Sequence, residues 1–297
     1  FGRSTGSVFL DYHIAWGYGR CMETRYSCLL CSRILDMHWL KLLWLFFRLG
    51  FMNELAYRAN FYMQFVQSLL NVGVALASLA VIFEHTNDLN GWKPAQLVAL
   101  LGVYFLMSGV IGTLIQPNMQ RLMEGVQSGT LDFTLTKPGD AQLLISIGEI
   151  RVWRLIDIFQ GLVILVLAIW HLGGEASLWQ VASFILTLVS GIGIVYSFWF
   201  MLATLSFWLV RVENILVIFQ SLYEAGRWPI GIYPRWLRST LTFVVPIAFA
   251  ITVPAQALIG TLSIETLLGS VILSFLMLVC TRFFWLCGIR NYSGASA

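Results

Sequence analysis

The chain has 297 residues, of which 58% are hydrophobic and 11% are charged, and its mean hydropathy is +0.78. A soluble globular domain carries about 25% charged residues, so the composition excludes water as the main solvent and predicts an all-α protein that crosses a membrane several times. The net charge of +3 is too small, and the basic residues are too scattered, to indicate a nucleic-acid partner.

Residues 1–36 differ from the rest of the chain, since they show neither helical nor strand periodicity. Cys28 and Cys31 have CxxC spacing, but a zinc site needs four ligands and no second pair follows. We therefore expect no metal site and no cofactor in this chain. We interpret residues 1–36 as a poorly ordered extension or an upstream misread start that carries no function, and residues 37–297 as one transmembrane domain.

Residues 37–60 predict a helix that lies in the membrane interface. The segment is apolar, but Lys41 and Arg48 interrupt it, and each charge would cost about 2.5 kcal/mol or more at the centre of a bilayer. In the interface, Trp39 and Trp44 can occupy the headgroup depth while the cations reach water. An interfacial amphipathic helix therefore fits this segment better than a span.

Six apolar stretches then predict transmembrane helices: residues 61–83, 94–116, 152–170, 178–210, 214–223 and 266–286. The fourth stretch is longer than a ~30 Å hydrocarbon core requires. We therefore expect it to tilt, to project or to break near Gly191 and Gly193, and these glycines also favour close helix packing. The fifth stretch is short.

The fifth stretch leads into residues 226–260, which are apolar but interrupted by four prolines. Broken backbone at membrane depth is tolerated only where it packs in protein or lines a cavity. We predict a re-entrant helical hairpin that dips into the outer leaflet and returns before the last helix, with an ordinary kinked span as the alternative. The candidate gating residues are Glu224, Arg227, Pro229, Pro234, Pro246 and Pro254. The spacing of the first two permits an ion pair.

The distribution of Lys and Arg predicts that both termini lie in the cytoplasm. With six spans and a cytoplasmic N-terminus, ten of these residues beyond position 36 fall inside the cell. Four fall outside: Lys93, Arg227, Arg235 and Arg238. On this topology, residues 118–146 form the longest cytoplasmic segment.

The segment 118–146 is polar and rich in glycine, unlike the apolar runs on either side. Residues 119–126 predict a short helix, Gly125 and Gly129 predict turns, and residues 141–153 predict a return to helix. Apolar side chains alternate with polar ones between these helices. A simple linker needs no apolar side chains beside acids, so we interpret the segment as a docking surface for another subunit.

Two parts of the sequence resemble the ABC-2-type permeases, in particular an uncharacterised bacterial branch of that superfamily. EGVQSGTLD at 124–132, followed by LTKP at 135–138, is similar to the cytoplasmic coupling region of these proteins. WPIGIYP at 228–234 and FVVPIAFAITVPAQALIG at 243–260 resemble the signature that precedes their last helix. The resemblance covers residues 38–292.

This resemblance implies a permease subunit of the bacterial inner membrane that pairs with a second permease subunit, the same chain or a related one, and rests on a cytoplasmic ABC ATPase. The residues that would couple to the ATPase are Glu124, Gly125, Gly129, Leu131, Asp132, Phe133, Lys137 and Pro138. The sequence has no phosphate-binding GxxxxGK[ST] loop, because none of Lys41, Lys93 and Lys137 follows a glycine. We therefore predict no enzymatic activity here and expect ATP to bind to the partner subunit.

Arg151, Arg154 and Asp157 form a charge cluster at the predicted cytoplasmic end of the third span. We favour snorkelling anchors and an internal ion pair, with a substrate contact as the alternative. Since no ionisable residue falls at the predicted bilayer midplane, we expect export of an amphiphilic or lipid-like substrate by a protein surrounded by membrane lipid. A non-transporting structural subunit of a larger membrane complex and a lipid-modifying membrane enzyme are the alternative functions.

Overall fold

The computed structural model describes residues 44, 48, 51, 58–86, 88, 89, 91–137, 139–173, 177–209 and 213–292. The chain divides into two compact units, Phe1–Leu49 and Gly50–Ala297. In the first unit only Trp44 and Arg48 are described, and both are helical and exposed. The predicted extension 1–36 lies outside the described residues, as does most of the predicted interfacial helix 37–60.

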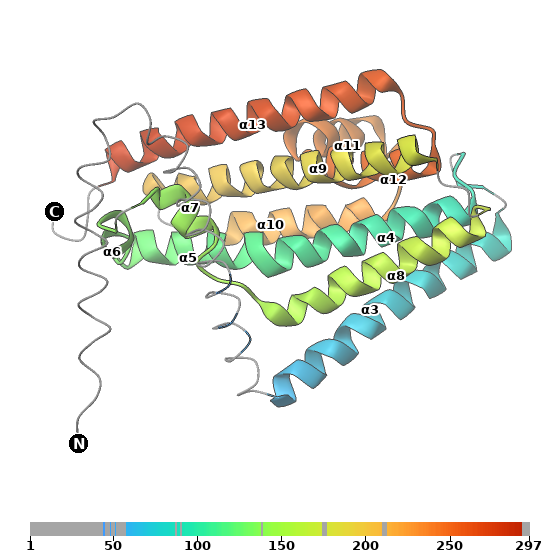
Figure 1. The fold of residues 1–297 in the computed structure, drawn as a ribbon, viewed down its shortest axis with the longest axis horizontal. Coiled ribbons are helices and arrows are strands. Elements are labelled where there is room, and N and C mark those ends of the chain that lie inside the picture. Colours follow the sequence, from blue (N-terminus) through green and yellow to red (C-terminus); the bar gives the residue numbers. More distant parts are fainter. Residues whose placement is uncertain are drawn as a thin grey trace, which may run out of the picture. The chain divides into compact units, whose positions relative to one another are not determined.

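Five long apolar helices dominate the described part of Gly50–Ala297 (Figure 1). They are α3 (Arg58–His85), α4 (Pro94–Val110), α8 (Leu155–His171), α9 (Leu178–Thr204) and α13 (Ile264–Asn291). α4 continues through a π-helical turn, η2 (Ile111–Ile115), into α5 (Gln116–Gln127), so that 34 residues form one continuous helix. The described residues form helices and no strand, which confirms the all-α prediction. Each of the five helical stretches is long and apolar enough to cross a membrane and coincides with a predicted span.

The fifth predicted span is α10 (Glu213–Glu224), whose 12 residues extend only about 18 Å. A hydrocarbon core of ~30 Å needs a longer helix, so a sixth crossing stays a prediction. The proline-rich stretch after α10 folds into short helical pieces. They are η5 (Ala225–Arg227), η6 (Ile230–Ile232), α11 (Arg235–Ser239), η7 (Thr240–Val244), η8 (Ala248–Thr252) and α12 (Val253–Ile259). The prolines thus interrupt the helix as expected, whereas entry of this region into a membrane stays a prediction.

α9 runs without interruption through Gly191 and Gly193, so the helix does not break there. Both glycines instead permit close packing. A Cβ on Gly191 would lie 3.0 Å from the Cα of Ala250 in η8, and a Cβ on Gly193 would lie 2.6 Å from the Oγ of Ser274 in α13. The glycines therefore let α9 approach two neighbouring elements, as the sequence indicated.

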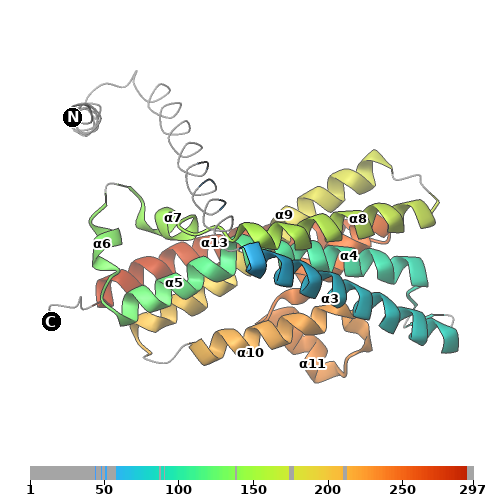
Figure 2. The same ribbon diagram turned by 90° about the horizontal axis from the view of Figure 1, so that it is seen from below.

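α4 and α8 lie side by side with almost no space between their backbones (Figures 1 and 2). A Cβ on Gly161 of α8 would lie 2.4 Å from the backbone N of Leu106 in α4. A Cβ on Gly109 of α4 would lie 2.6 Å from the backbone N of Ile158 in α8. Small residues at such contacts let helix backbones approach in a membrane, where association depends on van der Waals packing.

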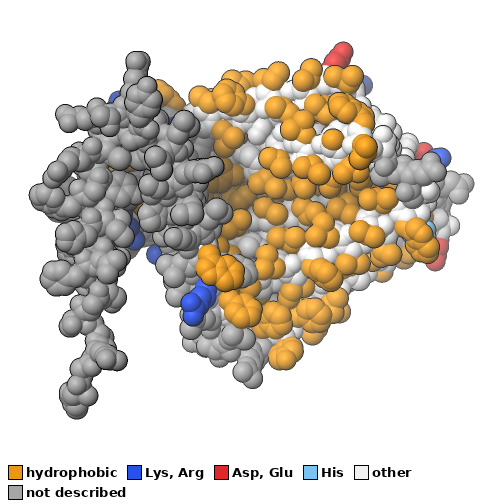
Figure 3. Space-filling view, in the orientation of Figure 1, with side chains coloured by type: hydrophobic (Ala, Val, Ile, Leu, Met, Phe, Trp, Pro, Cys, Tyr) orange, Lys and Arg blue, Asp and Glu red, His pale blue; other side chains and the backbone are white. Residues whose placement is uncertain are grey.

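The outward faces of these helices are apolar (Figure 3). Exposed large side chains include Phe65 and Leu69 of α3, Phe159 and Val166 of α8, and Phe275 of α13. The acidic and basic side chains visible in Figure 3 lie toward the edges of this apolar surface. So large an apolar surface is unfavourable in water, and together with five span-length helices it makes the chain a multi-pass membrane protein.

Between α4 and α8 the chain forms what we call the arm, residues 116–151 (Figure 2). The arm contains α5, α6 (Asp132–Leu135), α7 (Ala141–Ser146) and a non-helical return that leads into η3 (Val152–Arg154) and α8. The helix expected over residues 141–153 therefore ends at Ser146. Gly148, Glu149 and Arg151, in the non-helical return, instead form hydrogen bonds to α5 and η2.

Asn118 holds the arm together. Its side chain is fully buried, donates to the Glu149 carbonyl at 2.9 Å and accepts from the Glu149 N–H at 2.8 Å. The Arg121 guanidinium donates to the neighbouring carbonyl of Gly148 at 3.1 Å. Because a buried amide that lost these partners would be costly, the return of the arm is fixed against α5.

Asp140 fixes the start of α7 and ties the arm to α13. Its carboxylate accepts hydrogen bonds from the backbone N–H groups of Gln142 at 2.9 Å and Leu143 at 3.4 Å, as an N-cap residue does. The Arg282 guanidinium of α13 donates to the same carboxylate at 3.0 Å. Partial burial raises the pKa of Asp140, but Arg282 and the two N–H groups outweigh it, so the pKa lies below its ordinary value of 3.8.

Gly161→Ala is expected to destabilise the bundle, because the added methyl group overlaps the backbone of Leu106 and forces α4 and α8 apart. Overpacking of this kind costs about 1–3 kcal/mol. Thermal unfolding of the purified protein in detergent measures the loss as a lower Tm. Gly73→Ala in α3 is the matched control, since a Cβ there meets no atom within 4 Å. Equal Tm values for the two variants would contradict the close approach of the helices.

Asp140→Asn is expected to lower stability by about 0.2–1 kcal/mol, because asparagine keeps the helix cap but loses the charge that pairs with Arg282. Asp140→Ala also removes the cap and should cost about 1 kcal/mol more. Since the folded pKa is lowered, the charge stabilises fully above the unfolded pKa, and this stabilisation disappears as the pH falls through the folded pKa. Thermal unfolding from about pH 7 to about pH 3 should show the gap between wild type and Asp140→Asn closing only in acid. A gap that is the same at every pH would argue against the ion pair.

Candidate functional site

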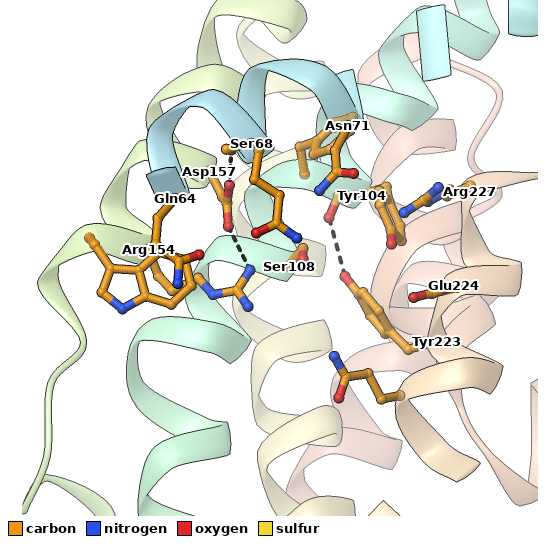
Figure 4. A pocket seen from close by; sticks show the side chains of 14 residues that line it. Gln64, Ser68, Asn71, Tyr104, Ser108, Arg154, Asp157, Tyr223, Glu224 and Arg227 are labelled. Atoms are coloured by element: carbon orange, nitrogen blue, oxygen red, sulfur yellow. Dashed lines mark hydrogen bonds and ion pairs between the residues drawn. The ribbon is translucent and has the colours of Figure 1, made fainter. Parts of the chain in front are cut away.

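A cavity of about 290 Å³ lies between α3, α4, the start of α8 and the end of α10 (Figure 4). Its lining is polar although the surrounding bundle is apolar. Four of the lining residues are charged: Arg154, Asp157, Glu224 and Arg227. Polar cavities between apolar helices are where membrane proteins place functional groups, so this cavity is the candidate functional site.

α3 supplies a stripe of uncharged polar side chains to the cavity. Gln64, Gln67, Ser68 and Asn71 all line it, and Figure 4 labels three of them: Gln64, Ser68 and Asn71. Their spacing of three, one and three residues places them on one face of a helix. The stripe offers amide and hydroxyl groups that both donate and accept hydrogen bonds.

Asp157 is a buried carboxylate, with 6% of its surface exposed. Arg154 donates to its Oδ2 at 3.1 Å, and the Ser68 hydroxyl of α3 donates to its Oδ1. Burial of a charge is costly unless the charge is paired and hydrogen-bonded. Arg154 and Ser68 therefore stabilise the carboxylate, and their contacts join α3 to the start of α8.

The wall formed by α10 is attached to α4 through two tyrosines. The Tyr223 hydroxyl donates to the backbone carbonyl of Tyr104 at 3.2 Å, and the two rings stack with centroids 5.3 Å apart. The Arg227 guanidinium lies 5.2 Å from the centroid of the Tyr104 ring, within the range of a cation–π interaction. Aromatic contacts thus place the end of α10 beside α4.

The ion pair that the spacing of Glu224 and Arg227 permits does not form in the described part of the chain. No ion pair among the described residues includes either side chain. Arg227 lies over Tyr104 instead, and its buried Nε has no hydrogen-bond partner. Two opposite charges without ionic partners therefore line one cavity.

The predicted cluster of Arg151, Arg154 and Asp157 is divided between two environments. Arg154 and Asp157 form the internal ion pair that the sequence favoured. Arg151 faces the arm instead, where it donates to the Gln120 Oε1 at 3.0 Å and pairs with Glu149 at 3.4 Å. Of the remaining gating candidates, Pro229, Pro246 and Pro254 are buried and Pro234 is exposed, and none lines the cavity.

The arm exposes several of the residues predicted to couple to an ATPase. Glu124 and Lys137 are exposed, Asp132 is partly exposed, and the Phe133 ring is 72% exposed. Leu131 is only 3% exposed and packs into the hydrophobic core of this chain. Leu131 therefore cannot supply the exposed apolar contact expected of it.

The two glycines of the arm have different roles. Gly129 has φ +72 and makes the expected turn, a conformation that favours glycine. Gly125 lies inside α5 instead of at a turn, and its carbonyl accepts a hydrogen bond from the Leu131 N–H at 3.0 Å. Pro138 lies outside the described residues.

Arg154 connects the arm to the cavity. Its side chain packs on Gly112 in the π-helical turn, where a Cβ would lie 2.9 Å from the Arg154 Cδ. Three residues earlier, the Arg151 N–H donates to the carbonyl of Thr113 in the same turn at 3.1 Å. The return of the arm is therefore docked on the π-helical turn directly beside the cavity.

Reasoning from the sequence missed the α3 stripe, Tyr104 and Tyr223. The stripe had a detectable signal, because its polar residues recur at helical spacing within an uncharged span. The tyrosines had none, since they are 119 positions apart in the chain. Among the residues that the structure describes, no three His, Cys, Asp or Glu side chains are grouped to hold a metal ion.

The family model described as "ABC-2 family transporter protein" matches residues 69–296. No curated protein and no solved structure matches the chain. The matched residues include α4, the arm, α8 and all later helices, and the match confirms the resemblance to ABC-2-type permeases. The chain therefore belongs to the ABC-2 transporter family, as a membrane component of a transporter and not as its catalytic part.

Proposed function

We propose that this chain is the permease subunit of an ABC transporter in the inner membrane of a bacterium, with both termini in the cytoplasm. It forms the membrane pathway together with a second permease subunit, the same chain or a related one, and exports an amphiphilic or lipid-like substrate. A separate ABC ATPase binds the arm and supplies ATP hydrolysis. The observation that carries this proposal is the continuous contact from the arm through Arg154 to the polar cavity, in a chain of the ABC-2 family.

The length of the helix that runs from α4 into α5 supports docking on the arm. Its 34 residues extend about 51 Å, roughly 20 Å beyond a ~30 Å hydrocarbon core. The extra length is α5, which buries Met119, Leu122 and Met123 and exposes Arg121 and Glu124. An amphipathic helix of this kind, tied to Phe133 and the rest of the arm, suits a surface that a water-soluble ATPase reaches.

The route from arm to cavity supports coupling between the two. The arm is internally fixed by Asn118, so a displacement caused by the ATPase would move its return segment as one body. That segment leads directly into η3, whose Arg154 packs on Gly112 and pairs with Asp157. A shift of the arm would therefore change the charges that line the cavity.

Combined substitution of Glu124→Ala, Asp132→Ala and Phe133→Ala is expected to remove the ATPase from the complex. The exposed ring and the acids are the contacts that the arm offers, and loss of central interface contacts lowers affinity by about tenfold or more. A pull-down from native membranes in mild detergent, with the bound subunits identified and ATPase activity assayed, measures the loss. The matched control combines Ile264→Ala and Glu265→Ala, two exposed residues at the opposite end of α13 from Arg282. Undiminished recovery with the arm variant would exclude the arm as the docking site.

Gly112→Ala is expected to uncouple the transporter without releasing the ATPase. The new methyl group would lie 2.9–3.2 Å from three atoms of the Arg154 side chain and displace it from Asp157. Substrate stimulation of ATP hydrolysis should fall by about fivefold or more, the range of allosteric coupling, while recovery of the ATPase is unchanged. Gly269→Ala in α13, where a Cβ meets no atom within 4 Å, is the control. Normal stimulation in Gly112→Ala would disprove transmission through Arg154.

A further inference from the structure

The four charged residues of the cavity differ in how their charges are compensated. Arg154 and Asp157 neutralise each other at 3.1 Å. Arg227 and Glu224 take part in no ion pair among the described residues, and the Arg227 Nε is buried without a hydrogen-bond partner. A buried donor that stays unsatisfied is unfavourable. Glu224 is exposed, whereas Arg227 is only partly exposed. Arg227 is therefore the charged residue of the cavity that lacks both an ionic partner and full access to water.

We propose that the cavity binds a zwitterionic group, in which Arg227 holds an anionic phosphate or carboxylate and Glu224 holds an ammonium. The inference rests on the transport function proposed above, because it names the chemistry of the molecule that the transporter recognises. A guanidinium presents planar N–H donors that match the oxygens of a phosphate or carboxylate. A carboxylate in turn accepts hydrogen bonds from an ammonium group.

The charge balance of the cavity favours a zwitterion over a simple ion. Arg154 and Arg227 are offset by Asp157 and Glu224, so the formal charge of the lining is zero. An anion alone would pair with Arg227 but would leave Glu224 uncompensated beside it. A cation alone would leave Arg227 uncompensated. Only a ligand with both charges pairs with both side chains. The pairing matters most for the partly buried Arg227, because uncompensated charge is costly away from water, and the exposed Glu224 is free to bind a cation.

The space and the neutral lining fit a small polar group. A volume of about 290 Å³ corresponds to roughly ten water molecules at ~30 Å³ each, which accommodates a headgroup such as phosphoethanolamine with some water. Gln64, Gln67 and Asn71 of α3 and Gln220 of α10 line the cavity and supply neutral donors and acceptors. They can bind the ester or hydroxyl oxygens of such a group without disturbing the charge balance.

A zwitterionic group of this kind can belong to a phospholipid or to a water-soluble molecule. The two helices at the sides of the cavity, α3 and α10, also carry exposed apolar side chains, among them Val66 and Leu69 of α3 and Val217 and Ile218 of α10. Acyl chains can lie on these faces while the headgroup occupies the cavity. The experiment below separates the two sources.

The test measures binding of defined probes to the purified full-length chain in lipid-free detergent by isothermal titration calorimetry. The probes are dihexanoyl-phosphatidylethanolamine, which is zwitterionic, dihexanoyl-phosphatidylglycerol, which is anionic, and glycerophosphoethanolamine, which has the headgroup without acyl chains. The phosphatidylethanolamine probe should bind about tenfold or more tightly than the phosphatidylglycerol probe. Equal or tighter binding of phosphatidylglycerol, or no saturable binding of either ethanolamine probe, overturns the proposal. Comparable binding of glycerophosphoethanolamine supports it with a water-soluble ligand, and binding of the lipid alone supports it with a lipid headgroup.

Variants of the two charged residues locate the site. Arg227→Gln and Glu224→Gln should each weaken binding of the zwitterionic lipid by about tenfold or more, and Arg227→Lys should retain part of it. Arg235→Gln and Glu265→Gln are matched controls, because both residues are exposed and neither lines the cavity. Unchanged binding in both cavity variants overturns the assignment. Should a variant fail to fold, the comparison of probes on the wild-type chain still decides.

The outcome is separable from that of the proposed function. A chain that recovers an ATPase in the pull-down but binds no zwitterion overturns this inference and leaves the transport function intact. A chain that binds the zwitterion through Arg227 and Glu224 but recovers no ATPase supports the site and removes the transport function.

Discussion

The ion pair between Arg154 and Asp157 is the contact on which the arrangement of helices around the cavity depends. A carboxylate inside an apolar bundle requires a partner, and Arg154 reaches it by packing on Gly112 in the π-helical turn. The same carboxylate accepts a hydrogen bond from Ser68 and so draws α3 toward α8. Single π-helical turns within α-helices are often found at functional sites. Here the turn lies where the return of the arm meets the bundle. The buried Asp157 carboxylate of α8 therefore connects α3 and the helix that contains α4 to the arm, through its contacts with Ser68 and Arg154.

The helical spans were predictable because apolar length is a local property of the sequence, and five of the predicted spans are present. Features that depend on tertiary contacts were not. The helix predicted over residues 119–126 is present, but it joins the predicted second span, residues 94–116, as one continuous helix to Gln127, and α5 buries one face against the rest of the protein. Leu131 alternates with polar residues as an exposed contact would, but the turn at Gly129 directs it into the core. The turn itself was correctly predicted, since glycine is the residue that adopts its backbone conformation without strain.

The cavity could be predicted only in part. Its polar stripe on α3 is visible in the sequence, and the pairing of Arg154 with Asp157 followed from their spacing. The meeting of these residues with Glu224 and Arg227 depends on the position of α10, which long-range contacts such as that of Tyr223 with Tyr104 determine. Arg154 with Asp157, and Glu224 with Arg227, were placed on opposite sides of the membrane by reasoning from spans alone, but all four line a single cavity. The interior of the bundle is therefore not uncharged, and its lining is compatible with a headgroup that carries charges.

The division of charges in the cavity also suggests how its affinity for a ligand can depend on the arm. While Arg154 is bound to Asp157, only Arg227 and Glu224 are available to a zwitterion. If the arm moves and withdraws Arg154, Asp157 becomes a second carboxylate without an ionic partner, and the lining acquires a net negative charge. The balance that favours a zwitterion is then lost, and the anionic part of the ligand meets repulsion where it was previously compensated. Because such linkage is reciprocal, a ligand that prefers the neutral cavity also stabilises the position of the arm in which Arg154 and Asp157 are paired.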